Sequence, residues 1–240
     1  MNILEINHFS KSYSKDKKAC NDVCLNVESG DIFGFIGHNG AGKSTTIRSV
    51  VGVLDFEEGS IKIDNHDVKE EPLECKKITA YIPDNPDLYE NLTGLQYLNF
   101  VADAFDINEV DRKQRINDYA ERFEIKDALT DMISSYSHGM KQKVAIISAL
   151  IHEPKLLVLD EPFVGLDPKA SFILKETMHE LCAKGSAVFF STHVLDVAEK
   201  LCNKIAIIKK GKIIANGAIE ELLDGKESLE EVFLEAVKDE

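Results

Sequence analysis

The sequence predicts an α/β fold with a mainly parallel sheet, an N-terminal antiparallel β subdomain and an inserted α-helical subdomain. Three observations support this prediction. Apolar runs at 156–159, 187–190 and 205–208 have the unbroken character of central strands that are covered on both faces. Alternating apolar and polar residues near the N-terminus indicate half-buried strands. From about 88 to 150 the apolar residues instead recur at helical spacing, and strand signals are almost absent.

Size and charge restrict the class of protein. A chain of 240 residues is long enough for one large domain, or one domain with an inserted lobe, around a sizeable core. Its hydrophobic content of 44% and charged content of 29% are ordinary for a globular protein. The formal net charge of −14 argues against a nucleic-acid partner bound through bulk charge.

Cysteine usage and apolar runs indicate the compartment. The five cysteines are scattered without a C-x-x-C pair, so we expect reduced thiols in a cytosolic protein rather than disulfides or a cysteine metal site. The first residues lack a basic region followed by an apolar core, so no secretory signal is expected. The longest apolar stretch, 144–151, is far short of the ~20 residues that span a bilayer, so a membrane role would require a partner.

The first predicted elements are strands. One contains Ile3, Leu4 and Ile6, and the next contains Val23, Leu25 and Val27 in alternation with polar residues. Tyr13 is expected in the loop between these two strands. The turn at 29–31 leads into an apolar strand at 32–36, and Ile61 and Ile63 mark a further strand.

Helices follow, first in the insert at about 85–150 and then between the later strands. The expected apolar faces of the insert are Leu95, Leu98, Ala102 and Phe105, and then Ile116, Tyr119, Ala120 and Phe123. Later helices carry Leu174, Met178, Leu181 and Cys182, stopped by Gly185, and then Val194, Ala198 and Leu201. Residues 209–212 are typical of a hairpin turn, and 228–234 of a short amphipathic helix that begins at Ser228.

The stretch Gly37-His38-Asn39-Gly40-Ala41-Gly42-Lys43-Ser44 has the spacing G-x-x-x-x-G-K-S between a strand and a helix. This is the P-loop pattern in its expected context. Its glycines let backbone N–H groups turn toward phosphate oxygens, and the helix adds its positive N-terminal end. Lys43 can reach the β- and γ-phosphates, and the Ser44 hydroxyl can hold Mg²⁺. We therefore predict nucleoside triphosphate binding; the alternative is a glycine-rich turn that binds nothing.

Two carboxylates and a histidine follow later strands. Asp160 ends an apolar strand, where a Mg²⁺ ligand is needed beside a P-loop, and Glu161 can polarise a water for attack on the γ-phosphate. The alternative is a solvated acidic strand end. His193 could contact the γ-phosphate, or it could be an ordinary packed or exposed residue.

The segment 136–142 begins another helix. Ser137 is a good N-cap, and the N–H groups around Gly139 form a second candidate anion site. Ordinary helix capping is the equally weighted alternative.

Taken together, these motifs resemble those of the ATP-binding subunit of ABC transporters over nearly the whole chain. Residues 37–44 are similar to the Walker A loop, 156–161 to Walker B, and 191–193 to the switch-histidine segment. The resemblance implies catalytic roles for Glu161, His193 and Lys43. It implies ATP contacts from Tyr13, which would stack on adenine, and from Gly37, His38, Asn39, Gly40, Ala41, Gly42, Lys43, Ser44 and Thr45. It implies a D-loop at Gly165, Leu166 and Asp167, and Mg²⁺ ligation by Ser44, Asp84 and Asp160.

The chain departs from the family pattern in two places. The signature, usually L-S-G-G-Q, reads Tyr136-Ser137-His138-Gly139-Met140, which retains the serine and second glycine expected to touch the γ-phosphate. The function of the signature is therefore expected to be preserved. His138 could add a hydrogen-bond donor or slow closure of the dimer. Asp84 stands where the family usually has glutamine; a carboxylate can still bind Mg²⁺ but adds negative charge beside the γ-phosphate.

The resemblance also implies partners and organisation. Family members close as head-to-tail dimers, in which the signature residues Ser137, His138, Gly139 and Met140 contact the ATP of the partner chain. The chain is expected to pair with an identical or homologous ATPase chain, to use ATP and Mg²⁺, and to dock near 84–98 on a separate integral-membrane permease. This corresponds to a cytoplasmic protein, peripheral on the inner face of the cell membrane, of the export type. An ATPase domain at 1–220 and a helical tail at 221–240 are the expected divisions.

Two other functions stay open at this stage. A soluble ABC ATPase acting on ribosomes or DNA usually carries two cassettes, long insertions or a basic surface, none of which is present here. A catalytically silent regulatory module is disfavoured by Lys43, Asp160, Glu161 and His193, but the altered signature and Asp84 leave it possible.

Overall fold

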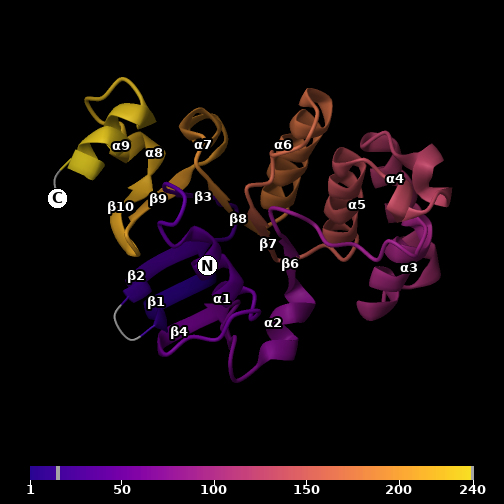
Figure 1. Ribbon diagram of the computed structural model, residues 1–240, viewed down its shortest axis with the longest axis horizontal. Helices are drawn as coiled ribbons and strands as arrows, with labels where there is room; N and C mark the ends of the chain where they lie inside the picture. The colour runs from indigo at the N-terminus through magenta and orange to yellow at the C-terminus, as the bar shows by residue number, and fades with distance from the viewer. Residues whose placement is uncertain (15–16, 239–240) are drawn as a thin grey trace.

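The computed structural model describes residues 1–14 and 17–238. An antiparallel sheet formed by the N-terminal third of the chain lies beside a larger sheet, and a helical lobe extends from the far end (Figure 1). The antiparallel sheet has the strand order β2-β1-β4-β5. Its strands are β1 (Asn2–Ser14), β2 (Lys17–Glu28), β4 (Glu58–Ile63) and β5 (His66–Asp67).

The larger sheet has the strand order β10-β9-β3-β8-β7-β6. The strands from β9 to β6 are parallel to their neighbours, and only β10 is antiparallel, because it forms the predicted hairpin with β9. In chain order they are β3 (Ile32–Ile36), β6 (Thr79–Ile82), β7 (Leu156–Asp160), β8 (Ala187–Thr192), β9 (Lys204–Lys209) and β10 (Lys212–Ala218).

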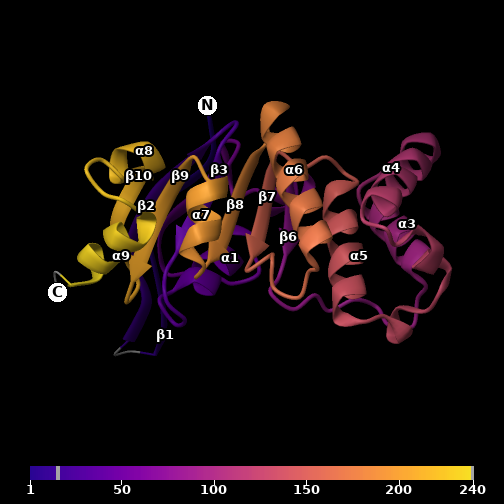
Figure 2. The same ribbon diagram turned by 90° about the horizontal axis from the view of Figure 1, so that it is seen from above.

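Helices cover both faces of the larger sheet (Figure 2). These are α1 (Lys43–Val50), α2 (Pro72–Ile78), α6 (Pro168–Ala183), α7 (Leu195–Leu201), α8 (Ile219–Leu222) and α9 (Leu229–Lys238). The helical lobe consists of α3 (Gly94–Ala104), α4 (Glu109–Arg122), α5 (His138–Leu150) and two 3-10 turns, Lys126–Thr130 and Ile133–Ser135. The predicted fold class is confirmed.

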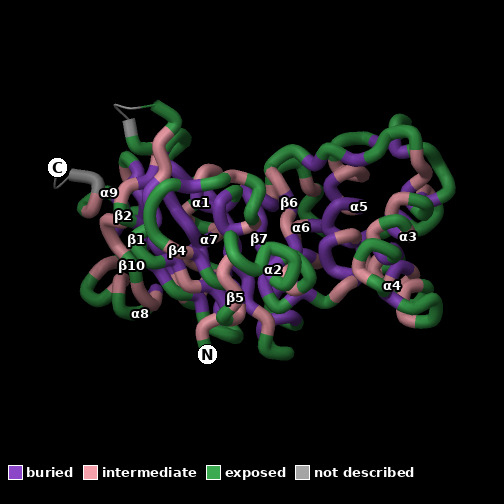
Figure 3. The backbone as a smooth tube through the Cα atoms, turned by 90° about the horizontal axis from the view of Figure 1, so that it is seen from below, coloured by how far each residue is buried: buried purple, intermediate pink, exposed green. Residues whose placement is uncertain are grey.

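Alternation along the central strands explains why both faces need a helix. Successive side chains of a strand point to opposite faces. Phe189 therefore packs in one cluster with the α1 residue Ile47, whereas Phe190 packs in another with the α6 residue Leu174 on the other face. All four side chains are completely buried. Figure 3 shows buried residues in purple along these strands. A fully apolar run is thus the sequence pattern that a doubly covered strand requires.

Several local expectations differ from the structure. Tyr13 is not in a loop, because it lies within β1, which extends through Ser14. Leu95 and Val194, expected on buried helix faces, are 41% and 43% exposed. Each stands at a helix start, where few turns surround it: Leu95 is the second residue of α3, and Val194 is the N-cap of α7.

Two short elements, α2 with seven residues and β6 with four, were not predicted, because both are too short to show a period. The boundary at 220 stays a prediction, and α8 runs across that position. Among residues 1–14 and 17–238, no helix has both the length and the apolar character to cross a membrane.

Candidate functional site

The loop 37–44 connects β3 to α1, as the strand–loop–helix pattern predicts. Gly42 is the N-cap of α1 with φ of 117°, a conformation that side chains disfavour. A Cβ there would lie 2.8 Å from the carbonyl oxygen of Ala19 in β2. Among the described residues no side-chain hydrogen bond caps α1, so the first N–H groups of the helix are available to an anion.

Three side chains from three different elements converge on the loop. Lys43 is 6% exposed, and its Nζ donates to the Gly37 carbonyl at 2.6 Å. Glu161 Oε1 lies 3.6 Å from Lys43 Nζ and 3.0 Å from His193 Nδ1, although neither contact is a hydrogen bond. The side chain of Glu161 is 16% exposed, whereas that of His193 is 51% exposed. The carboxylate is therefore fixed between a buried cation and a histidine at the surface.

Ser191 positions both carboxylate residues. Asp160 and Ser191 are direct neighbours in the parallel β7–β8 register. Ser191 Oγ donates to Asp160 Oδ1 at 2.5 Å and accepts from the Glu161 backbone N–H at 3.0 Å. Glu161 has φ of 50°, a conformation that is costly for a non-glycine residue. One hydroxyl thus supports the strand end at which the chain turns sharply and directs Glu161 toward Lys43.

The oxygen atoms at this corner suit a hard divalent cation. Asp160 Oδ2 is buried and has no hydrogen-bond partner among the described residues, which is costly unless a ligand satisfies it. Ser44 and Asp84 line the same cleft, Asp84 from the exposed loop after β6. Mg²⁺ prefers carboxylate and hydroxyl oxygens of this kind. The pKa of Tyr81 is raised, mainly because the side chain is buried and secondly because of the negative charge of Asp160.

Lys43, Asp160 and Glu161 line one cleft of about 980 Å³, close to the upper end of the volume range of ligand sites. His193 does not line this cleft, although its ring lies beside Glu161. Tyr13 forms part of one wall; it is 64% exposed, and its hydroxyl lies 3.3 Å from Thr45 Oγ1. The cleft residues that the sequence predicted are Tyr13, Asn39, Gly40, Gly42, Lys43, Ser44, Thr45, Asp84, Asp160 and Glu161.

Other cleft residues were missed by sequence reasoning. Ser14, Lys18, Ala19 and Lys210 also line the cleft. They come from the ends of β1 and β2 and from the turn between β9 and β10, and no motif marks them. The sequence signal for Ser191 was a polar residue near the carboxyl end of an apolar strand, but its contact with Asp160 depends on the β7–β8 pairing. His38 does not line the cleft; its ring packs edge-on against Phe233 of α9, with 5.0 Å between the ring centroids.

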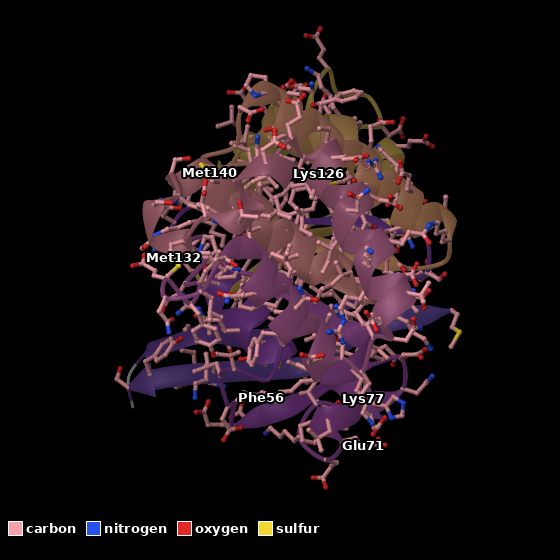
Figure 4. The ribbon with its side chains drawn as sticks, turned by 90° about the vertical axis from the view of Figure 1, so that its right-hand side faces the viewer. Phe56, Glu71, Lys77, Lys126, Met132 and Met140 are labelled. Atoms are coloured by element: carbon pink, nitrogen blue, oxygen red, sulfur yellow. The ribbon has the colours of Figure 1, made fainter. Side chains whose placement is uncertain are left out.

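The signature segment lies outside this cleft. Ser137 is the N-cap of α5 and accepts from the Met140 N–H at 3.3 Å, and Tyr136 is buried with its hydroxyl donating to the Ala128 carbonyl. Met140 lies on the helical lobe, at the opposite end of the view from Phe56 in Figure 4. No signature residue lines the cleft of residues 37–45.

The signature and the D-loop lie together. The His138 ring covers Gly165, where an added Cβ would lie 2.4 Å from His138 Cδ2 and where φ is 81°. Lys143 Nζ pairs with Asp167 Oδ2 at 2.9 Å, and Asp167 caps α6 by accepting from the Ala170 N–H at 2.8 Å. The Ala170 N–H, and next Lys143, lower the pKa of Asp167. The predicted site residues therefore form two groups, the cleft and the signature–D-loop patch.

Comparisons with known proteins identify the family to which the chain belongs. The family model described as ABC transporter matches residues 20–164. The ABC-type transporter ATP-binding protein EcsA of Bacillus subtilis (strain 168) is 35% identical over 243 residues, which cover 100% of this chain and 98% of that protein.

Two solved structures extend the comparison. One, described as the ATP-binding subunit of an ABC transporter, aligns with a TM-score of 0.94 and 35% identity over 98% of this chain and 99% of that chain. The other, cbiO1 of Clostridium perfringens, described as part of the ABC transporter complex cbiONQ, aligns with a TM-score of 0.80 and 26% identity over 99% and 96% of the two chains. From its motifs, its cleft and these relatives, the chain belongs to the ABC transporter family, as an ATP-binding subunit.

Proposed function

We propose that this chain binds and hydrolyses ATP, with Mg²⁺, to power an ABC transporter through closure of two ATPase chains on a separate membrane permease. The observation that carries the proposal is the position of Glu161: its carboxylate lies between Lys43 and His193 at the mouth of the phosphate loop. A general base must reach the attacking water beside the phosphate it acts on. A silent module would have no need for this constellation.

Each cleft residue has a distinct role in this proposal. Backbone N–H groups within the loop 37–45 and the Lys43 ammonium bind the phosphates, and Tyr13 stacks on adenine. Glu161 accepts a proton from the attacking water, and His193 contacts the γ-phosphate. Ser44, Asp84 and Asp160 would hold Mg²⁺, which supplies charge neutralisation at the phosphates. His38 and Ala41 shape the loop from outside the cleft.

Dimer closure follows from the separation of the two groups of site residues. Ser137, Gly139 and the N-terminus of α5 are exposed or half-buried and lie away from the chain's own cleft. In a head-to-tail pair each signature, with His138 and Met140, faces the ATP of the other chain, and the D-loop residues Gly165, Leu166 and Asp167 lie at the same interface. Contacts to the γ-phosphate then make closure depend on ATP. The second ATPase chain is either identical or homologous.

The junction between the core and the helical lobe supports docking of the permease. An apolar cavity of about 270 Å³ opens there, lined by the end of α1, by α2 and β6, and by Phe105 of the lobe. Val53, which lines this cavity, is 68% exposed, and Leu73, which follows the lining residue Pro72, is 71% exposed. Tyr89 and Phe100, within or beside the predicted docking segment 84–98, are 55% and 50% exposed. A helix from a cytoplasmic permease loop fits such an apolar groove.

This docking gives the chain its location, cytoplasmic and peripheral on the inner face of the cell membrane. The named relatives support the transporter assignment over a soluble ATPase acting on ribosomes or DNA: EcsA is a transporter protein, and cbiO1 is part of a transporter complex. The net charge of −14 supports the same choice, since no nucleic-acid partner is expected. An export-type, two-component system is the subclass that we propose.

The test is co-purification of an N-terminally tagged Glu161→Gln chain, with ATP, from gently solubilised native membranes. This variant should trap the closed dimer on its permease, whereas a Lys43→Ala control should not respond to ATP. A stoichiometric polytopic protein identified by mass spectrometry supports the proposal. Ribosomal or DNA-repair partners without a membrane protein would overturn it. A wild-type chain that binds ATP but never hydrolyses it, even with its partner, would favour the silent module.

A further inference from the structure

Three side chains with metal-binding atoms meet on the outer face of the antiparallel sheet, away from the nucleotide cleft. They are His8 of β1 and Asp22 and Cys24 of β2. The imidazole Nδ1, a carboxylate oxygen and the thiol sulfur lie within 4.8 Å of one another. In the described part of the chain, no other three histidine, cysteine, aspartate or glutamate side chains meet in this way.

The distances are close to those of a coordination sphere. His8 Nδ1 is 3.7 Å from Cys24 Sγ and 2.8 Å from Asp22 Oδ1. Tetrahedral zinc places a nitrogen and a sulfur ligand about 3.6 Å apart, and a nitrogen and an oxygen ligand about 3.4 Å apart. The nitrogen–sulfur separation already matches. The nitrogen–oxygen pair must open by roughly 0.6 Å, which exposed side chains can do by small rotations.

The backbone at this point brings the three residues together. The β1–β2 register shifts between Ile6 and Phe9. Within that irregularity His8 has φ of 51°, and Asp22 in the facing strand has φ of 59°. Bulges of this kind redirect side chains from their regular faces. A regular ladder would not give His8 the same approach to both residues of the neighbouring strand.

The surroundings support two of the proposed ligands. The His8 backbone N–H donates to Cys24 Sγ at 3.2 Å, a contact that orients the sulfur beside the imidazole. The Asp22 backbone N–H donates to the buried Ser10 Oγ at 3.1 Å, which fixes the backbone that carries the carboxylate. Hydrogen bonds around metal ligands orient them in this way.

We propose that His8, Asp22 and Cys24 form a surface site for a zinc-like divalent cation. One nitrogen, one oxygen and one sulfur ligand suit zinc, and a water would complete four-coordination. On binding, the Cys24 thiol gives up its proton to solvent and the ion bridges β1 and β2. The site was not predicted from the sequence, because its ligands come from two strands and show no C-x-x-C spacing.

The sulfur separates this site from an ordinary ion pair. His66 and Glu71 form a similar contact, with Nδ1 and Oε1 2.9 Å apart, but no cysteine completes a group of three there. If the His8–Asp22 contact were only an ion pair, the two places would respond alike to a metal. They differ in having, or lacking, a soft ligand that zinc and cobalt prefer.

The test is titration of the reduced, nucleotide-free full chain with Co²⁺, followed by competition with Zn²⁺. Thiolate ligation gives a near-ultraviolet charge-transfer band that carboxylate or imidazole binding does not give. We expect this band in the wild-type chain, with one ion per chain and unchanged elution size. It should vanish in Cys24→Ser, while Zn²⁺ affinity falls at least about 10-fold in His8→Ala and Asp22→Asn. His66→Ala, the matched control, should behave like wild type.

Three outcomes would overturn the site. No band at millimolar cobalt excludes thiolate ligation. A band that survives Cys24→Ser places the metal on another cysteine. One ion per two chains, with dimeric elution, would mean that Cys24 ligates between molecules rather than within one. Circular dichroism of each variant distinguishes lost ligation from lost folding.

Discussion

The nucleotide cleft and the signature–D-loop patch differ in how far their functional residues are buried. In the cleft, Asp160, Lys43 and Glu161 are mostly buried, and each holds or approaches another functional residue. In the patch, Ser137 and His138 are exposed, and their contacts stay within the patch. The cleft is largely assembled inside one chain, whereas the patch presents its groups outward. A residue in the first region should therefore act on ATP affinity, and a residue in the second on events between chains.

The largest effect should come from Lys43→Ala. Removing a buried ammonium from the phosphate site should weaken ATP binding by at least about 100-fold, because charged hydrogen bonds in such sites are strong. Isothermal titration of the single chain with ATP measures this. Lys200→Ala, which removes an exposed lysine of α7, is the control. Unaltered ATP affinity in Lys43→Ala would contradict the assignment of the loop.

The second prediction concerns His152, which stacks on Phe105 with 3.8 Å between ring centroids in the helical lobe. Burial lowers the pKa of His152 from 6.5 to about 4. The unfolded chain thus binds this proton first, so its contribution to stability is present above about pH 6.5 and is lost as pH falls toward 4, by up to about 3 kcal/mol.

Urea unfolding between pH 7.5 and 4.5 tests that effect. His152→Phe keeps an aromatic stack but removes the titration, so its stability should fall less steeply with acid than that of the wild type. His179→Gln alters an exposed histidine and is the control. Identical slopes for wild type and His152→Phe would show that the buried ring does not set the acid sensitivity.

Ser191→Ala should have the next largest effect. The variant removes the donor to Asp160 Oδ1 and the acceptor for the Glu161 N–H. Loss of a residue that orients a metal ligand typically costs 10- to 100-fold in metal affinity, so we expect about that loss in Mg²⁺-dependent ATP binding. ATP binding without Mg²⁺ should change much less. An equal loss with and without Mg²⁺ would point to a collapsed loop instead.

Ser137→Ala tests the outward-facing region. We expect roughly a 10-fold fall in ATP hydrolysis at protein concentrations that allow pairing, with unchanged ATP affinity of the single chain. The change also removes a helix cap worth about 1 kcal/mol. Thr93→Ala is the matched control, because it removes the cap of α3, whose geometry is similar, without touching the signature. If Thr93→Ala slowed hydrolysis equally, helix stability would explain the effect.

The smallest effect should come from Tyr13→Phe. Only the exposed hydroxyl contact to Thr45 Oγ1 is lost, so ATP affinity should change less than about threefold. Tyr13→Ala, which removes the ring, should weaken binding about 10-fold if the ring stacks on adenine. Measured side by side, equal losses in the two variants would locate the contribution in the hydroxyl and not in the ring.

The sequence predicted most of the fold and of the cleft, for reasons visible in particular residues. The run 156–159 is apolar throughout because both faces of β7 are covered, and a fixed motif spacing identifies 37–44. Leu95 was misplaced because helical period alone does not tell where a helix begins. Lys18 and Lys210 could not be predicted to line the cleft. They belong to β2 and to the β9–β10 turn, which come together only through tertiary packing. Motifs report local chemistry, and long-range neighbours require the sheet order.

The edge-on contact between His38 and Phe233 has a practical consequence for anyone shortening this chain. Phe233 and Leu229 pack in one cluster with Ile36, the residue directly before the phosphate loop, and the Leu229 N–H donates to Glu199 of α7 at 2.7 Å. A chain cut before residue 229 would therefore uncover apolar surface under the loop and release the ring that His38 rests on. Helix α9 therefore supports the phosphate loop, and a purification tag is better placed at the N-terminus.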